Sequence, residues 1–415
     1  MKKKSHYRTC ILIILICTAV LHIAACFKQF CDWYTDHLYP YWAEWLGRLT
    51  AKLPFVLGEW LIILAAVLVL LAVIFLILLP FLREKERYRR FTAGYCKTLL
   101  MIFCGSALYY SLVWAVPFRG TVLGKPENGL RKEYSYQEID ALLRYIQENA
   151  DAAAEEIEIH ADGTVDFPTP EESRLKIEAA LHDLSAEYPR LNGYYPPVKD
   201  AFSSDILRRM NIAGVTLPYT MEVLHEKYYA QNPIERLITD AHELTHHMGF
   251  YKESAATFLS ALALSQSDDP FLRFAAFKEM YFYVEADYME ARNEYMDALR
   301  QAYPEIPALE WDKLKGMQPD ERKALMQKVS EAEKQYAGVY PYLSERAWDI
   351  WTAAEGNEQE AYEAETHPID AMPAVDQAIG KAGDAGWTVQ DAVLQEHTYE
   401  GAVLLLLQYF DGKLY

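Results

Sequence analysis

Three residues in one stretch of the sequence have the types and spacing of a zinc site. His242, Glu243 and His246 form the pattern H-E-x-x-H, with the two histidines four residues apart. Residues four apart lie on one face of a helix, so both imidazoles can bind the same Zn²⁺ ion. Glu243 lies beside them and can act as a general base on water. The pattern therefore predicts a metal-dependent hydrolytic site.

The residues around this pattern predict the helix that must position it. Asn232 is a favourable N-cap residue, Pro233 suits the first helical position, and Gly249 suits the position after a helix end. We therefore expect a helix over residues 233–248, within a metal site that spans 232–258. On such a helix His247 points about a hundred degrees away from His246, so we interpret it as solvent-exposed or as a support for the site.

The third metal ligand is expected just after this helix. A metzincin would have a histidine at the position of Lys252, and a charged lysine binds zinc poorly. Glu253 opens the next helical run and can fold back over the two histidines, and a more distant carboxylate such as Glu279 or Glu285 is the alternative. Its setting, Glu253-x-x-Ala256-Thr257, resembles the E-x-x-[AS]-[DN] segment of thermolysin-like and membrane gluzincins. The resemblance implies that Glu253 binds zinc and that Thr257 supports a ligand histidine, with a hydroxyl in place of an acid.

The same residues also have a simpler interpretation. His242 and His246 can be ordinary surface histidines, and Glu243 can be a solvated helix residue. Glu253 can be an acid that stabilises a helix start through the helix dipole. A bare H-E-x-x-H match has a chance probability on the order of a few per cent in a chain of this composition, so the context must decide.

The charge distribution divides the chain of 415 residues into two parts. Residues 1–116 contain 13 Lys and Arg against 6 Asp and Glu, whereas the remaining residues contain 27 against 53. Because residues 117–415 are strongly acidic, nucleic acid is disfavoured as a partner. The same acidity suits a soluble domain that is held away from a membrane surface. All six cysteines lie within the first 104 residues, which excludes a thiolate zinc site downstream.

Three apolar stretches, residues 9–27, 60–82 and 98–118, are long enough to cross a bilayer. Basic residues precede the first stretch and separate the second from the third, which places both regions on the cytoplasmic side. The sequence thus predicts a multi-pass protein with a cytoplasmic N-terminus and an extracytoplasmic C-terminal domain. We expect a membrane anchor over 1–118, with an external aromatic loop over 28–59, and a second domain over 119–415.

The first apolar stretch can alternatively be a cleaved signal peptide. The residues from Ile23 to Cys26, I-A-A-C, resemble a bacterial lipoprotein cleavage box, in which Cys26 would carry the lipid. Cleavage there would leave the topology of the later helices unchanged.

The expected fold is mainly α, with three transmembrane helices followed by a predominantly helical, zincin-like α+β domain with a small β-sheet. The strand signal lies in residues 212–223, directly before the expected zinc helix. In zincins an edge strand beside the metal helix pairs with the extended substrate. The residues expected to pair are Thr216, Leu217, Tyr219 and Thr220, and a buried structural hairpin is an equally open alternative. The candidates for stabilising an oxyanion are Tyr219, His225, Tyr281 and Tyr399.

Several segments together resemble an uncharacterised bacterial membrane family, domain of unknown function 3810. They are W-Y-T-x-x-L-Y-P, L-P-F-x-x-G-E, Y-P-x-L-N-G and H-E-L-T-H-H-M-G-F-x-x-E, in addition to three membrane helices. The family resembles membrane-tethered zincins, and the resemblance implicates His242, Glu243, His246 and Glu253. Where the family usually has Glu-x-Glu-Ala-Asn, this chain has Ala255 and Thr257 at the third and fifth places.

These observations predict a membrane-anchored zinc metallopeptidase that cleaves peptides or proteins in the cell envelope and contacts the lipid bilayer. The departures at Ala255 and Thr257 motivate an alternative from another class, a catalytically weak or inactive zincin-fold scaffold or cell-envelope sensor.

Overall fold

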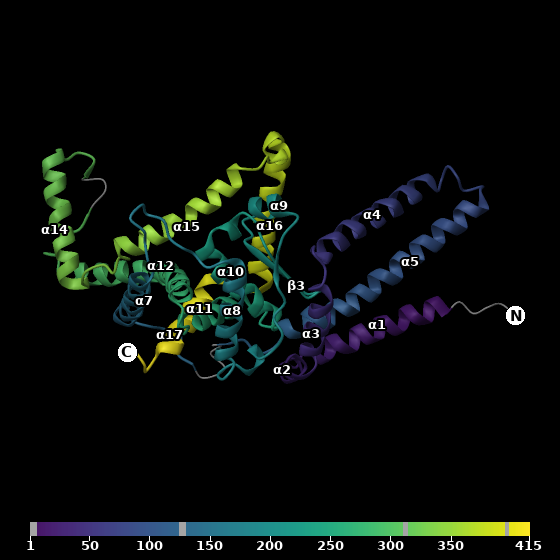
Figure 1. The fold of residues 1–415 in the computed structure, drawn as a ribbon, viewed down its shortest axis with the longest axis horizontal. Helices are drawn as coiled ribbons and strands as arrows, with labels where there is room; N and C mark the ends of the chain where they lie inside the picture. Colours follow the sequence, from purple (N-terminus) through teal and green to yellow (C-terminus); the bar gives the residue numbers. More distant parts are fainter. Residues whose placement is uncertain (1–5, 124–129, 310–313, 395–397) are drawn as a thin grey trace.

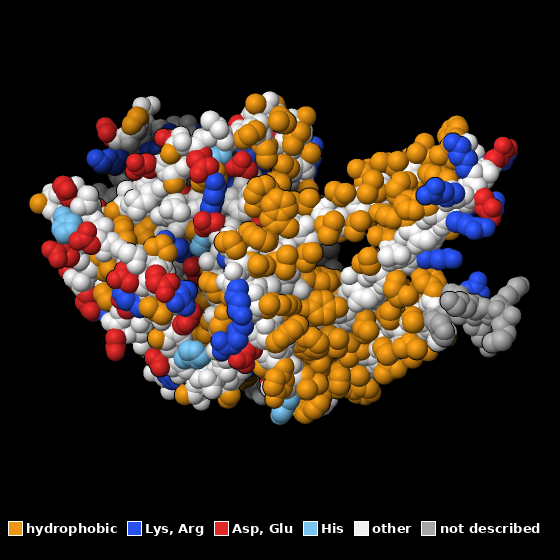
Figure 2. Space-filling model, turned by 45° about the vertical axis from the view of Figure 1, so that its right-hand side comes forward, with side chains coloured by type: hydrophobic (Ala, Val, Ile, Leu, Met, Phe, Trp, Pro, Cys, Tyr) orange, Lys and Arg blue, Asp and Glu red, His pale blue; other side chains and the backbone are white. Residues whose placement is uncertain are grey.

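The computed structural model describes residues 6–123, 130–309, 314–394 and 398–415. The protein is mainly helical, with 71% helix and 3% strand. Three helices, α1, α4 and α5, extend together from one side of a helical body, and α14 lies at the opposite end of that body (Figure 1). Their exposed apolar side chains form a continuous hydrophobic surface (Figure 2).

The three extended helices are long and apolar enough to cross a membrane. They are α1 (His6–Ala24), α4 (Leu57–Leu78) and α5 (Glu86–Tyr110), and α5 continues through a π-helical segment (Ser111–Ala115) into α6 (Val116–Phe118). The third helix begins at Glu86, well before the expected residue 98. Hydropathy locates the apolar part of a helix, and the charged first turns of α5 remain helical outside that part.

Two short helices, α2 (Lys28–His37) and α3 (Tyr39–Thr50), connect α1 to α4. One face of α3 is exposed and aromatic, with Tyr41 and Trp45 at its surface, as an interfacial segment requires. The opposite face is buried and small, with Ala43 and Gly47. This buried face lets α3 approach the helical body closely.

The sheet of the described residues has three short strands, β1 (Val198–Asp200), β2 (Gly214–Leu217) and β3 (Glu222–His225). Their order is β1-β3-β2, with β3 parallel to β1 and antiparallel to β2. Thr216 pairs with Val223, so β2 and β3 form the hairpin that the sequence indicated. β2 is an edge strand, and it lies against the helix that carries the H-E-x-x-H pattern.

The body is built around two central helices, α10 (Pro233–His247) and α11 (Glu253–Ser265), most of whose residues are buried. The helices that contact them are α8 (Pro170–Leu184), α12 (Pro270–Ala302), α15 (Glu345–Glu363) and α17 (Thr398–Phe410), and α7 (Tyr136–Glu156) packs along α12. The apolar helix α17 packs on α11 and α12, as expected for a helix too short to cross a bilayer. The described residues also form the α-helices α9 (Ser204–Arg209), α14 (Pro319–Ala337) and α16 (Pro373–Leu394), and three short 3-10 helices at Pro189–Leu191, Tyr229–Gln231 and Pro368–Ala371.

Candidate metal centre

The two central helices bring the predicted ligands together. The Asn232 side chain accepts hydrogen bonds from the backbone amides of Ile234 and Glu235, which fixes the start of α10 as the sequence indicated. The helix ends at His247, and Gly249 has a φ of +90°, a left-handed conformation that turns the chain back. Helix α11 then begins at Glu253, so this carboxylate faces the last turns of α10.

The side chains of His242, His246 and Glu253 converge on one point. The Nε2 atom of His242 lies 3.1 Å from Oε2 of Glu253, and the Nε2 atom of His246 lies 3.3 Å from the same oxygen. All three potential ligand atoms lie within 4.8 Å of one another. This spacing suits three ligands around one ion, since zinc binds nitrogen and oxygen at about 2 Å.

The contacts on the far side of each ring show whether the ligand nitrogens are free to bind a metal. Nδ1 of His246 lies 2.7 Å from the carbonyl oxygen of Phe250, which can only accept, so Nδ1 carries the proton. In the neutral ring Nε2 therefore presents a lone pair to the Glu253 carboxylate. Nδ1 of His242 lies 3.3 Å from the hydroxyl of Thr257, in the supporting place predicted for that residue. The lone pairs of the two Nε2 nitrogens and of the Glu253 oxygen point at one another, so a cation or a proton must lie between them. The three residues therefore fit a zinc ion.

The charges of this group depend on each other. Burial disfavours the charged form of His246, but the Glu253 carboxylate outweighs that effect and raises the pKa of His246 to about 9. Burial likewise opposes ionisation of Glu253, yet the two histidines hold its pKa well below the usual value. The metal-free protein thus holds a proton where the metal-bound protein would hold an ion.

Glu243 lies beside the three ligands in a different environment. Burial raises the pKa of its carboxyl group. The Thr216 hydroxyl of β2 lies 2.8 Å from Oε2 of Glu243 and 2.7 Å from its backbone oxygen. Gly214 makes this approach possible, because a Cβ at that position would lie 2.7 Å from Cγ of Glu243. The edge strand therefore orients the proposed base.

A cavity of about 230 Å³ opens onto this group and is lined by His242, Glu243, Glu253 and Thr257. Its other walls contain residues of the expected strand segment and of α10, the carboxylate of Glu279, and residues that the sequence analysis did not single out, such as Tyr229 and Trp387. The other lining residues are Asn211, Ile212, Ala213, Gly214, Tyr229, Ile238, Thr239, Ser260, Glu279, Tyr283 and Trp387. Tyr229, Glu279 and Trp387 belong to three elements other than α10, so only the fold brings them to the cavity.

The cavity lining includes none of the described candidates for oxyanion stabilisation. Tyr219 packs against Tyr109 and Tyr110 of α5. The Tyr281 hydroxyl donates to Glu285. His225 lies between two carboxylates, 2.8 Å from Asp240 and 3.0 Å from Asp200. The side chain of Tyr399 lies outside the described residues.

The residues expected to pair with a substrate divide into two groups. Thr216 contacts Glu243, and Gly214 lines the cavity, so the first half of β2 borders the candidate site. Leu217 packs close to Gly58 of α4, and the backbone oxygen of Thr220 accepts from Thr50 of α3. The second half of the segment therefore faces α3, α4 and α5.

We expected His247 either to be exposed to solvent or to support the site. The structure shows that the first expectation is wrong. The residue is fully buried, with 0% of its surface exposed. Its ring packs near Gly47 of α3, and burial lowers its pKa to about 4. His247 does point away from His246 around the helix. That face of α10 is not exposed, however, because α3 covers it.

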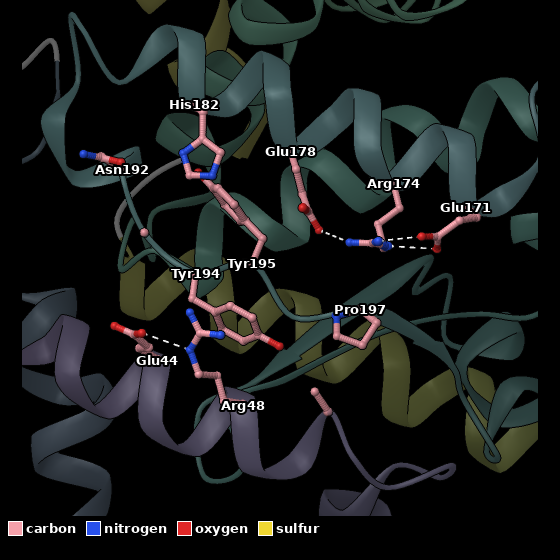
Figure 3. Close-up of a pocket in the computed structure, with 12 residues that line it drawn as sticks. Glu44, Arg48, Glu171, Arg174, Glu178, His182, Asn192, Tyr194, Tyr195 and Pro197 are labelled. Carbon is pink, nitrogen blue, oxygen red and sulfur yellow. Dashed lines mark hydrogen bonds and ion pairs between the residues drawn. The ribbon is translucent and has the colours of Figure 1, made fainter.

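A larger cleft of about 740 Å³ lies between α3 and α8, away from the metal ligands (Figure 3). Arg48 of α3 pairs with Glu44, and Arg174 of α8 pairs with Glu171 and Glu178. The ring of Tyr194 lies 4.3 Å from the Arg48 guanidinium carbon. Both arginines are thus already engaged within the protein.

The fold and site define a mainly helical protein with three helices able to cross a membrane and a His-His-Glu group at the centre of its helical body. Residues 34–350 match the family described as protein of unknown function (DUF3810), and the chain belongs to this family. Searches of curated proteins and of solved structures returned no significant match. The match begins in α2, so the family includes the membrane-proximal helices as well as the helical body.

Proposed function

We propose that this protein is a membrane-anchored, zinc-dependent metallopeptidase of zincin-like fold. It would hydrolyse peptide bonds on the extracytoplasmic side of a bacterial cytoplasmic membrane. The observation that carries the proposal is the convergence of His242, His246 and Glu253 beside the buried Glu243. Three protein ligands leave one coordination place open, which is typical of catalytic zinc and not of structural zinc.

Each residue of the group has a role in this proposal. Zinc, when bound, supplies a Lewis acid that polarises a carbonyl group and lowers the pKa of a water molecule. Glu243 accepts a proton from the attacking water and then delivers it to the leaving amine. Thr216 keeps the Glu243 carboxylate in place. Thr257 and the Phe250 carbonyl orient the two imidazoles.

The cavity walls suggest how a peptide would be held. The outer edge of β2 borders the cavity, so an extended peptide can add to the sheet as a further strand. Tyr229 and Tyr283 line the cavity, but their hydroxyls already donate to Glu235 and Glu279, so the proposal assigns no oxyanion stabiliser.

The proposed topology rests on the basic residues at the end of the α4–α5 hairpin that lies far from the body (Figure 2). Arg83, Lys85, Arg87, Arg89 and Arg90 are concentrated there. Such residues favour the cytoplasmic side, so the helical body would lie outside the cytoplasm. Its substrates would then be peptides or proteins of the cell envelope, and its acidic composition disfavours nucleic acid.

The second candidate function is a zincin-fold scaffold or envelope sensor with little or no catalytic activity. It is favoured by Thr257, whose hydroxyl polarises His242 less than a carboxylate would. Such a protein would still bind zinc, but its effect in the cell would not depend on a general base.

The substitution Glu243→Gln separates the two functions, because it removes the base and keeps all three ligands. For an enzyme, we expect a rate loss of about 10²–10⁴-fold with zinc content unchanged. The measurement compares the envelope proteins of deletion cells that carry the wild type or the variant, by mass spectrometry of newly formed peptide ends. Glu294→Gln, at an exposed position of α12, is the matched control. Identical peptide ends with wild type and Glu243→Gln, when both carry zinc, would favour the scaffold.

A further inference from the structure

The turn that joins the two ligand helices is held by the membrane-proximal helices. This turn, residues 248–252, lies between His246 and Glu253. A Cβ on its Gly249 would lie 3.0 Å from Cγ2 of Thr35 in α2 and 3.2 Å from Cε1 of Tyr39 in α3. The turn therefore lies in direct contact with α2 and α3, with no room for a larger residue.

Buried hydrogen bonds fasten this contact. The Tyr39 hydroxyl donates to the backbone oxygen of His247 at 2.9 Å and lies 2.9 Å from the Tyr251 hydroxyl. The Tyr251 hydroxyl donates to the backbone oxygen of Val113 at 3.0 Å, in the π-helical segment after α5. Tyr39 is only 1% exposed, so loss of its hydroxyl would leave a buried carbonyl without this partner.

The residues fastened in this way touch the ligands themselves. The ring of Tyr251 is stacked on that of His246, with centroids 6.3 Å apart and planes at 16°. Its neighbour Phe250 supplies the carbonyl that holds Nδ1 of His246. Tyr251 also belongs to an apolar cluster otherwise formed mainly by α2, α3 and the segment after α5. The orientation of His246 is thus set from the membrane side.

We infer that Tyr39 and Tyr251 are positioning residues of the metal centre, and that the membrane anchor is a structural part of that centre. The inference rests on the proposed zinc site and adds a form of regulation. A shift of α3 or of the segment after α5 moves the turn, which rotates His246 and moves Glu253. Zinc affinity then depends on the state of the membrane helices, because a misoriented ligand binds less well.

The test uses the full chain in detergent micelles and the variants Tyr39→Phe and Tyr251→Phe, which keep both rings and remove one hydroxyl each. We expect zinc affinity to fall about 10–100-fold, measured by competition with a chromophoric chelator. We also expect a changed visible absorption spectrum of the Co²⁺-substituted protein, which a loss of stability alone would not alter. Tyr95→Phe is the control, since its hydroxyl donates to Leu68 and links α4 to α5 instead.

Two results would overturn the inference in different ways. If the wild type binds zinc and both variants match it in affinity and Co²⁺ spectrum, the positioning role is wrong and the proposed function stands. If the wild type binds no zinc, the proposed function fails together with this inference. Should Tyr39→Phe fail to fold, Tyr251→Phe still decides, because its ring remains stacked on His246.

Discussion

Two groups of histidine and carboxylate lie near α10, and they differ in how their acceptors are satisfied. Around His225, each ring nitrogen has its own carboxylate, Asp240 on one side and Asp200 on the other. Around His242 and His246, two ring nitrogens share one oxygen of Glu253. The first group is complete as a protonated imidazole between two acids. In the second group both ring nitrogens point at the same carboxylate oxygen, so a proton or a cation must lie between them.

This difference separates a structural ion pair from a metal site. His225 and His246 are both buried, which lowers the pKa of each imidazole, and in both cases the acidic neighbours outweigh burial and raise the pKa. Perturbed pKa values alone would therefore not distinguish them. The deciding feature is geometric, because among the described residues His242, His246 and Glu253 direct three ligand atoms at one common point, and the His225 group does not.

The largest expected effect comes from removing one ligand. His246→Ala should lower zinc affinity by at least about 100-fold, since it removes one of three ligands from a site whose total binding energy is on the order of 10 kcal/mol. His225→Ala, made as the partner variant, should bind zinc as the wild type does. Elemental analysis after dialysis measures both. If His246→Ala and His225→Ala lose zinc equally, the proposed difference between a metal site and a structural ion pair is wrong.

A smaller effect is expected from the titration of His225. Burial opposes its charged form, but Asp240 and Asp200 raise its pKa from 6.5 to about 9. The stabilisation is therefore complete below about pH 6.5 and is lost as the pH rises through about 9. We expect a loss of about 2 kcal/mol, reduced from the full linkage value because solvent screens the exposed Asp200.

The measurement for this titration is unfolding in detergent with saturating zinc, at pH values from 6 to 10, for wild type and His225→Gln. The difference between the two proteins isolates His225 from other titrating groups. Parallel stability profiles across this range would show that His225 is not held as an imidazolium.

The smallest expected effect concerns the support of His242 by Thr257. Thr257→Asp should raise zinc affinity by roughly tenfold, because a carboxylate makes the imidazole that it holds more basic. Thr257→Val removes the hydrogen bond at similar volume and should lower the affinity. Competition titrations of the full chain measure both changes. A fall in affinity with Asp would mean that Thr257 does not act through His242.

Local patterns in the sequence predicted the parts of the site that local structure controls. The spacing of His242 and His246, the Asn232 cap and the turn at Gly249 all act within one helix and its ends, and each is present in the structure. Glu253 was predictable for the same reason, because it opens the next helix. The three membrane-length helices followed from apolar length alone, although the start of the third did not.

The sequence could not predict features that depend on contacts between distant segments. Tyr229 and Trp387 line one cavity only because separate elements of the fold meet there. The burial of His247 depends on α3, two hundred residues earlier in the chain. The tyrosine contacts between the anchor and the 248–252 turn are of the same kind. Helix periodicity describes one element, and these contacts depend on which elements become neighbours.

Zinc content of the purified full-length protein tests the central claim most directly. After dialysis against trace zinc and removal of loosely bound metal, the wild type should carry one Zn²⁺ per chain, because three converging ligands with oriented rings are present. His242→Ala/His246→Ala should carry none under the same conditions. Wild-type protein without bound zinc, or a double variant that retains it, would contradict the proposed metal centre.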